Sequence, residues 1–235
     1  MGGKGGNAIA LAVRAATATI PIVFGVGSDP VELGLVSNLG RPEGNLTGMT
    51  VLAQELNAKR LELLHETLPG ARTVVLLMNP SNLGTSVELR QTQAAADILG
   101  LKLHVLDAAT GPELERAFEL PPVKQGEALI VSSDAFFINA RKRILALSAL
   151  HRLPAFSSSR EFAVDGGLLS YGTRWSDMYR LIGGYAGRIL KGARPADLPV
   201  QRPTTYELVI NLKTARALGL AISPSILARA DEVVE

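Results

Sequence analysis

The chain has 235 residues, 47% of them hydrophobic and 20% charged, so it contains enough apolar material for a packed core and too little charge for a disordered polymer. Lysine and arginine number 24 against 22 aspartate and glutamate residues, a formal net charge of +2, and this balance argues against nucleic acid as a partner. The lack of cysteine excludes disulfides, thiolate zinc sites and cysteine nucleophiles. The length suits one large domain or two small ones.

Short apolar runs alternate with longer amphipathic segments, which is the pattern of βαβ units around a mostly parallel sheet. Most runs lack strict alternation, as is typical of strands buried on both faces. In chain order we expect a helix at 8–16, a strand at 21–26, helices at 30–39 and 54–68, a strand at 73–78, a helix at 85–99, a strand at 103–106, a helix at 112–119, a strand at 128–132, a helix at 138–151, strands at 154–157 and 168–171, a helix at 175–191 and a short helix after Ser223.

Capping residues mark several of the expected helix starts. Asp29 stands before a proline and offers a carboxylate N-cap. Thr110 with Glu113, and Ser158 with Glu161, have the spacing of a capping box. The strand series that begins at residue 73 suffices for one doubly wound sheet. The first segment offers a single strand, so a lobe built on it must recruit the C-terminal segment.

Membrane and export signals are not evident. The longest apolar runs, such as residues 20–26, are strand-sized and fall short of the ~20 residues that span a bilayer. The first residues lack both a basic leader and a sustained apolar segment, so we expect no export signal within this chain.

The catalytic and cofactor patterns that we tested do not fit. The glycines at 2–6 lack the strand and the Lys-Ser/Thr pair of a phosphate loop, although amides that open a first helix suit an anionic group. The three histidines are scattered, and no nucleophile elbow surrounds the serines at 132–133 and 157–159. We therefore expect no cofactor, no metal and no catalytic residue.

Polar side chains follow several of the expected strands. In an open α/β sheet, ligands bind outside the carboxyl ends of the strands. Here those ends are residues 27–29, 79–82, 133–134 and 157–158, which are small, polar and rich in hydrogen-bonding groups. Structural roles fit equally well, because Asp29 can cap a helix and Asn79 can start a turn. The sequence leaves both roles open.

An ordered set of segments extends along nearly the entire chain. The segments include IPIVF at 20–24, SDPV at 28–31, RPEGNLTG at 41–48, KRLELL at 59–64, GGLLSYG at 166–172 and ELVINLK at 207–213. Together they resemble the ABC-transporter substrate-binding protein family that includes the tryptophan-binding TrpX-like proteins. The ordered combination is far more specific than any single motif.

The resemblance implies an α/β fold of the type I periplasmic-binding-protein kind, in which two Rossmann-like lobes with parallel sheets clamp a small ligand across a hinge. It places the hinge crossings near 47–51, 171–173 and 205–210. Lobe two would then be 50–171, and lobe one would combine 1–49 with 172–235. Members ordinarily begin with a leader and a strand-helix-strand portion, so we expect lobe one to be incomplete by about eighty residues. An incomplete lobe exposes a sheet edge that favours self-association.

By position, the resemblance assigns ligand contacts to both lobes. In lobe one, Asn7 and neighbouring amides would face a carboxylate and Asp29 an ammonium or hydroxyl group. Asn45 and Thr47 would sit at the hinge.

Lobe two would supply the remaining contacts. Asn79, Asp134 and Ser157 would contribute hydrogen bonds. Tyr171 would add another, and the ring of Tyr171 or Phe136 would stack on a flat ligand.

We therefore interpret the chain as the solute-binding component of an ABC importer rather than an enzyme. It would bind an amino acid or similar small molecule, aromatic ones included, and present its closed form to an ABC permease at the periplasm or cell-envelope exterior. Two alternatives stay open. A cytosolic small-molecule sensor domain of a regulator would carry a DNA-binding helix-turn-helix. An α/β enzyme on a small hydroxylated substrate would show turnover that depends on Asp134 or the nearby serines.

Overall fold

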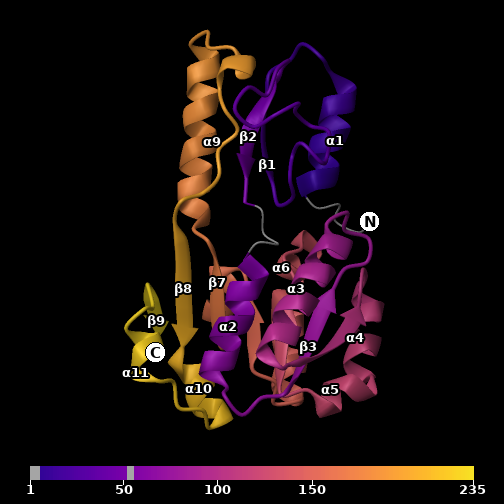
Figure 1. Ribbon diagram of the computed structural model, residues 1–235, viewed down its shortest axis with the longest axis vertical. Helices are drawn as coiled ribbons and strands as arrows, with labels where there is room; N and C mark the ends of the chain where they lie inside the picture. Colours follow the sequence, from indigo (N-terminus) through magenta and orange to yellow (C-terminus); the bar gives the residue numbers. More distant parts are fainter. Residues whose placement is uncertain (1–5, 52–55) are drawn as a thin grey trace. The chain divides into compact units, whose positions relative to one another are not determined.

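The computed structural model describes residues 6–51 and 56–235, and its contacts divide the chain into two units. The larger unit contains the described residues of Gln54–Gly172 together with Glu207–Glu235. The smaller unit contains the described residues of Lys4–Ala53 together with Thr173–Tyr206. The chain therefore leaves the larger unit after Gly172 and returns to it at Glu207 (Figure 1).

A seven-stranded sheet in the order β4-β3-β5-β6-β7-β8-β9 forms the centre of the larger unit. Strand β3 pairs in parallel with β4 and with β5, so that Leu76 lies opposite Val105 on one side and Ile130 on the other. The strands are β3 (Thr73–Met78), β4 (Lys102–Asp107), β5 (Ala128–Val131), β6 (Ala155–Ser157), β7 (Leu169–Thr173), β8 (Tyr206–Asn211) and β9 (Glu232–Val234).

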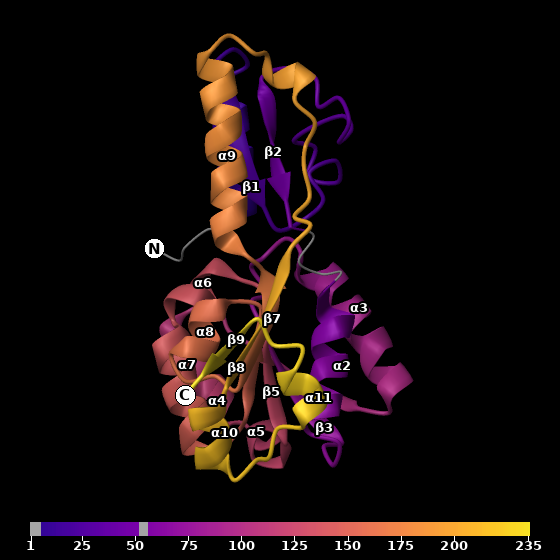
Figure 2. The ribbon, with the colours of Figure 1, turned by 90° about the vertical axis from the view of Figure 1, so that its left-hand side faces the viewer.

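Helices cover both faces of this sheet, which explains the continuous apolar sequence of β3. Val74, Leu76 and Met78 belong to the core on one face, whereas Val75 and Leu77 belong to the core on the other. Helices α2 and α3 lie on one side and α7 and α8 on the other (Figure 2). The helices are α2 (Asn57–Thr67), α3 (Thr85–Leu99), α4 (Gly111–Glu119), α5 (Pro121–Gln125), α6 (Ala135–Asn139), α7 (Arg141–Leu150), α8 (Arg160–Val164), α10 (Leu212–Leu218) and α11 (Pro224–Leu227).

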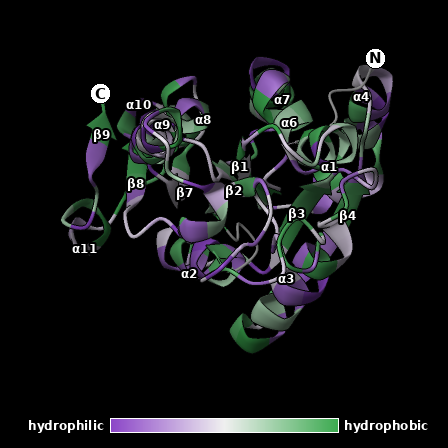
Figure 3. Cartoon of the chain, turned by 90° about the horizontal axis from the view of Figure 1, so that it is seen from above, coloured by the Kyte–Doolittle hydropathy of each residue, from purple (hydrophilic) through white to green (hydrophobic). Residues whose placement is uncertain are grey.

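Hydropathy follows the same layers. Strand β3 is coloured as hydrophobic, while α3 beside it shows both hydrophobic and hydrophilic residues (Figure 3). An amphipathic helix of this kind buries one stripe against the sheet and leaves the other in water.

The smaller unit is built on a parallel pair of strands, β1 (Ile22–Val26) and β2 (Leu46–Thr50), with α1 (Gly6–Ala16), α9 (Trp175–Leu190) and the 3₁₀ turn η2 (Pro195–Asp197). Phe24 and Ala10 pack in one core cluster, and Met178 of α9 packs with Met49 in another. Helix α9 crosses close above Gly25, where a Cβ atom would lie 2.5 Å from Cε of Met178. Glycine at this position therefore permits the helix to approach the sheet.

The predicted strands are all present, with small shifts at their ends. Three strands were not predicted, namely β2, β8 and β9. The predicted helix at 138–151 is divided into α6 and α7.

The predicted helix at 30–39 is wrong, because residues 30–34 form turns. Asp29 Oδ1 accepts the Val31 N–H at 2.7 Å, as expected of a cap. The backbone then reverses at Gly34, whose φ of +68° is in the left-handed region that ends helices.

The capping-box predictions had different outcomes. Thr110 Oγ1 accepts the Glu113 N–H at 3.4 Å, so the predicted N-cap is confirmed. The Glu113 side chain folds back as a capping box requires, but its Oε2 accepts the N–H of Ala109, one residue before the cap, at 2.8 Å. Helix α8 begins after Ser159, not Ser158, and the Ser159 hydroxyl donates to Glu161 at 2.7 Å.

The expected assignment of all of 172–235 to lobe one differs from the structure in its last part. Strands β8 and β9 belong to the seven-stranded sheet of the larger unit. Leu208 and Ile210 pack in the same core cluster as Leu76, because alternate residues of β8 continue the apolar face of the sheet. Within this segment, only Thr173–Tyr206 joins the smaller unit.

The described helices lack the combination of length and hydropathy that a bilayer-spanning helix needs. Within the same residues, no group of three or more His, Asp or Glu side chains is placed to hold a metal ion.

Candidate functional site

The polar residues that follow β3 and β5 form one hydrogen-bonded cluster. Asp134 Oδ1 accepts a hydrogen bond from Asn79 Nδ2 at 3.1 Å, and Asp134 Oδ2 accepts one from Asn82 Nδ2 at 2.8 Å. Because β3 and β5 are parallel neighbours, their carboxyl ends lie at the same edge of the sheet. Two predicted site residues, Asn79 and Asp134, are thus in direct contact although they are 55 residues apart in sequence.

Asp134 has a second structural task. Its Oδ1 accepts the Phe136 N–H at 2.8 Å and caps α6. The Phe136 ring lies 5.3 Å from that of Phe137, tilted by 50°. Both carboxylate oxygens of Asp134 are therefore engaged within the unit, and a contact between Asp134 and a ligand stays a prediction.

The ends of β5, β6 and β7 meet beside this cluster. The Ser133 hydroxyl donates to that of Ser158 at 2.9 Å. Ser157 is buried and lies opposite Ser170 in the β6–β7 register. At Gly172 the two backbones come so close that a Cβ atom would lie 1.9 Å from the Ser158 carbonyl oxygen.

A buried network of charged residues links α2, α3 and the strand ends. Arg60 of α2 is 1% exposed; its Nε donates to the Tyr171 carbonyl at 2.9 Å and its Nη1 to Asn57 Oδ1 at 2.5 Å. Burial lowers the pKa of Arg60 to about 10, an effect that the nearby Glu88 carboxylate opposes. Burial also raises the pKa of Glu88, against the opposing effects of Arg60, the Ser133 backbone N–H and Asn57.

Sequence reasoning did not identify Arg60 or Glu88. The signal was present in α2, because Arg60 falls on the same helical stripe as Leu61 and Leu64, which are fully buried. A charged residue on a buried stripe rarely occurs without a partner.

In the smaller unit, Asn7 and Asp29 lie at the carboxyl end of β1. Asn7 Nδ2 donates to the Ser28 hydroxyl at 2.8 Å, and Asn7 Oδ1 accepts the Gly27 N–H at 3.2 Å. Thr50, which was not predicted, donates its hydroxyl to the Ser28 carbonyl at 2.9 Å. Asn7 therefore joins the start of α1 to the loop that carries Asp29.

Asn45 and Thr47 are not where a hinge role requires them. Asn45 Nδ2 donates to the Ile20 carbonyl at 2.7 Å at the amino end of β2, opposite the end where Asp29 lies. Thr47 is fully buried within β2, and its hydroxyl donates to the Leu198 carbonyl at 2.6 Å. Both side chains stabilise the smaller unit internally.

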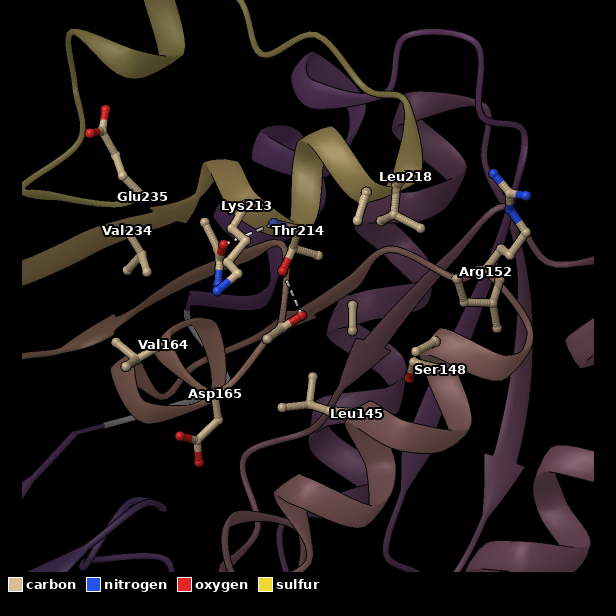
Figure 4. A pocket seen from close by; sticks show the side chains of 16 residues that line it. Leu145, Ser148, Arg152, Val164, Asp165, Lys213, Thr214, Leu218, Val234 and Glu235 are labelled. Atoms are coloured by element: carbon tan, nitrogen blue, oxygen red, sulfur yellow. Dashed lines mark hydrogen bonds between the residues drawn. The ribbon is translucent and has the colours of Figure 1, made fainter.

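The larger unit also contains a cavity of about 660 Å³, which none of the predicted site residues lines. Leu145 and Ser148 of α7 face Lys213 and Thr214 of α10 across it (Figure 4). The volume is in the range of ligand pockets. Several polar lining groups are already bonded internally, since Ser148 donates to Ile144, Thr214 donates to the Gly166 carbonyl and Asp165 pairs with Arg141.

Two solved structures have the same architecture as this chain. A conserved domain protein from Vibrio cholerae is 27% identical, with a TM-score of 0.89 over 97% of this chain and 76% of its own. The ABC domain from Streptococcus pneumoniae in complex with L-Trp is 25% identical, with a TM-score of 0.87 over 97% of this chain and 78% of its own. The chain has the α/β fold of the type I periplasmic binding proteins.

The family profile described as ABC transporter substrate binding protein matches residues 4–234. The chain belongs to this family. Among curated proteins, the tyrosine-binding protein of Clostridioides difficile strain R20291 is 26% identical over 206 residues, which are 87% of this chain. The match spans 59% of that relative's length.

Proposed function

We propose that this chain is the solute-binding component of an ABC importer and that its ligand is an aromatic amino acid. The proposal rests on the polar strand-end clusters, one in each unit, in a chain whose relatives include a tyrosine-binding protein and a protein solved with L-Trp. Ligands of open α/β sheets bind at such strand ends. We propose that residues of both units contact the ligand and that binding closes the hinge.

An aromatic amino acid carries an ammonium group, a carboxylate and a flat ring, and each has a proposed partner. Asp29 is a carboxylate at the end of β1 and suits the ammonium group. The first turn of α1 near Asn7 suits the carboxylate. Phe136 in α6 and Tyr171 in β7 are half-buried aromatic residues of the larger unit and suit the flat ring.

The family also suggests the partner and the place of action. We propose that the ligand-bound chain docks on an ABC permease outside the cytoplasm. Binding a ligand between hinged units shifts an equilibrium of open and closed forms, and the permease then recognises the closed form.

The test is thermal unfolding of the purified chain with L-Trp, L-Tyr and L-Phe, and with sugars, nucleosides and L-Ala as controls. A ligand at about one hundred times its Kd stabilises a protein by ~2.7 kcal/mol. We expect a saturable shift with at least one aromatic amino acid. A shift only with sugars or nucleosides, or none from a well-folded chain, would contradict the proposal.

We further propose that copies of this chain associate through the outer edge of β1. The Ile22 N–H donates to Asn45 and the Val26 carbonyl accepts from Val51, so these residues face β2. The backbone of Val23 therefore faces the other edge. Strand β1 has no charged residue to guard that edge. Beside it, α1 leaves Ile9 58% exposed.

A proline at position 23 tests this association, because it removes an N–H from the outer edge and none from the pairing with β2. We expect a concentration-dependent dimer in the wild type by light scattering after size exclusion, and a monomer in Val23→Pro. A wild type that stays monomeric at every concentration argues against the association.

A further inference from the structure

Arg60 is a buried charged residue that is not among the proposed ligand contacts, and its burial therefore needs another explanation. Moving a charge out of water costs several kcal/mol even after relaxation. Arg60 is 1% exposed, and among the described residues its Nη2 has no hydrogen-bond partner. A group held at such a cost needs a reason beyond packing.

The two hydrogen bonds of Arg60 join two segments that are distant in sequence. One acceptor is Asn57, the first residue of α2. The other is the carbonyl of Tyr171, 111 residues away and next to Gly172, where the chain leaves the larger unit. A planar guanidinium fixes two acceptors in a defined geometry, which a lysine cannot do.

Glu88 extends the network to the strand-end cluster. Glu88 is buried, and burial raises the pKa of its carboxyl group, while Arg60 and the Ser133 backbone N–H oppose that rise, so the carboxylate lies near both groups. Ser133 follows β5 and directly precedes Asp134. Its hydroxyl donates to that of Ser158, which follows β6, so Ser133 links the ends of these two strands. Arg60 and Glu88 thus connect α2 and α3 to two backbone positions of the sheet, Tyr171 in β7 and Ser133 after β5.

We propose that Arg60 is a positioning residue: it holds the Tyr171 carbonyl, and through Glu88 the Ser133 amide, in the geometry that the ligand requires. This proposal rests on the function proposed above only for the identity of the ligand. The positioning of the two backbone groups by Arg60 is a property of the larger unit and exists without ligand.

Two variants and a control test it. Arg60→Lys keeps the charge beside Glu88 and loses the two-acceptor geometry, and Arg60→Met loses both. Arg141→Lys is the matched control, because Arg141, like Arg60, donates to one side-chain oxygen and one backbone carbonyl, those of Asp165 and Ile138, yet is more exposed.

The first readout is amide hydrogen exchange without ligand. We expect exchange in peptides covering 131–136 and 169–173 to rise about tenfold in Arg60→Lys, with β3 and β4 unchanged. Unchanged exchange in these peptides, or an equal rise everywhere, would overturn the proposal. In folded Arg60→Met, we expect a larger rise in exchange in the same two groups of peptides.

The second readout is the Kd for L-Trp by calorimetry. We expect Arg60→Lys to weaken binding about tenfold, the effect of one lost charge-assisted hydrogen bond, and Arg141→Lys to leave it unchanged. Equal affinity of wild type and Arg60→Lys would overturn the link to the ligand. A wild type that binds no aromatic amino acid refutes the proposed function, while the exchange result still decides the positioning role.

Discussion

Gly172→Ala is expected to lower the free energy of unfolding by more than ~3 kcal/mol, at the upper end of overpacking effects. A Cβ atom at this position would lie 1.9 Å from the Ser158 carbonyl oxygen and 2.8 Å from its carbon. Both are backbone atoms that cannot rotate aside. The clash is relieved only when β7 and the end of β6 move apart, which disturbs the pairing of Ser157 with Ser170.

Gly183→Ala is the matched control in α9, where a Cβ atom would meet nothing within 4 Å. Alanine is favoured over glycine inside a helix by roughly 0.5–1 kcal/mol, so this variant should be slightly more stable. Urea unfolding followed by circular dichroism compares the two. A Gly172→Ala protein as stable as the wild type would show that the strand ends approach less closely than described.

Asp134→Ala is expected to cost about 3 kcal/mol of unfolding free energy, because it leaves buried donors without an acceptor. Asn79 Nδ2, Asn82 Nδ2 and the Phe136 N–H all donate to this carboxylate. The loss includes the N-cap of α6, for which ~1 kcal/mol is typical.

Two further variants, Asp134→Asn and Asp197→Ala, show whether a loss of stability in Asp134→Ala comes from its buried hydrogen bonds. The asparagine keeps one oxygen for the cap and should retain part of the stability, whereas Asp197 is in an exposed pair with Arg194 and its loss should change little. Denaturant unfolding ranks the three variants by their free energy of unfolding. If Asp134→Ala is no less stable than Asp197→Ala, the cluster does not stabilise the unit. Retention of the L-Trp shift in Asp134→Asn would identify the carboxylate as structural.

The sheet of the larger unit was largely readable from sequence because its strands are buried on both faces. Such strands appear as apolar runs, as in Thr73–Met78. Strand β2 has the sequence LTGMT and β9 only three residues, so neither gives that signal. The false helix at 30–39 failed at Gly34, whose positive φ depends on the folded loop.

The strand-end residues were predictable for a related reason. Parallel strands end at one edge, so Asn79 and Asp134 were expected together without knowledge of their hydrogen bonds. The role of Thr47 depends on the Leu198 carbonyl, 151 residues away, and that of Arg60 on Tyr171. No local pattern in the sequence specifies such partners.

The order of strands in the larger unit also sets the order of events during synthesis on the ribosome. Strands β3 to β7 emerge in succession, and domains generally begin to fold as they emerge. Strands β8 and β9 are made only after the whole of 173–206, which belongs to the smaller unit. Until then Leu168 and Leu169 lack Leu208 and Ile210, which belong to the same core cluster, and this exposed apolar edge is the part of the nascent sheet most prone to aggregation.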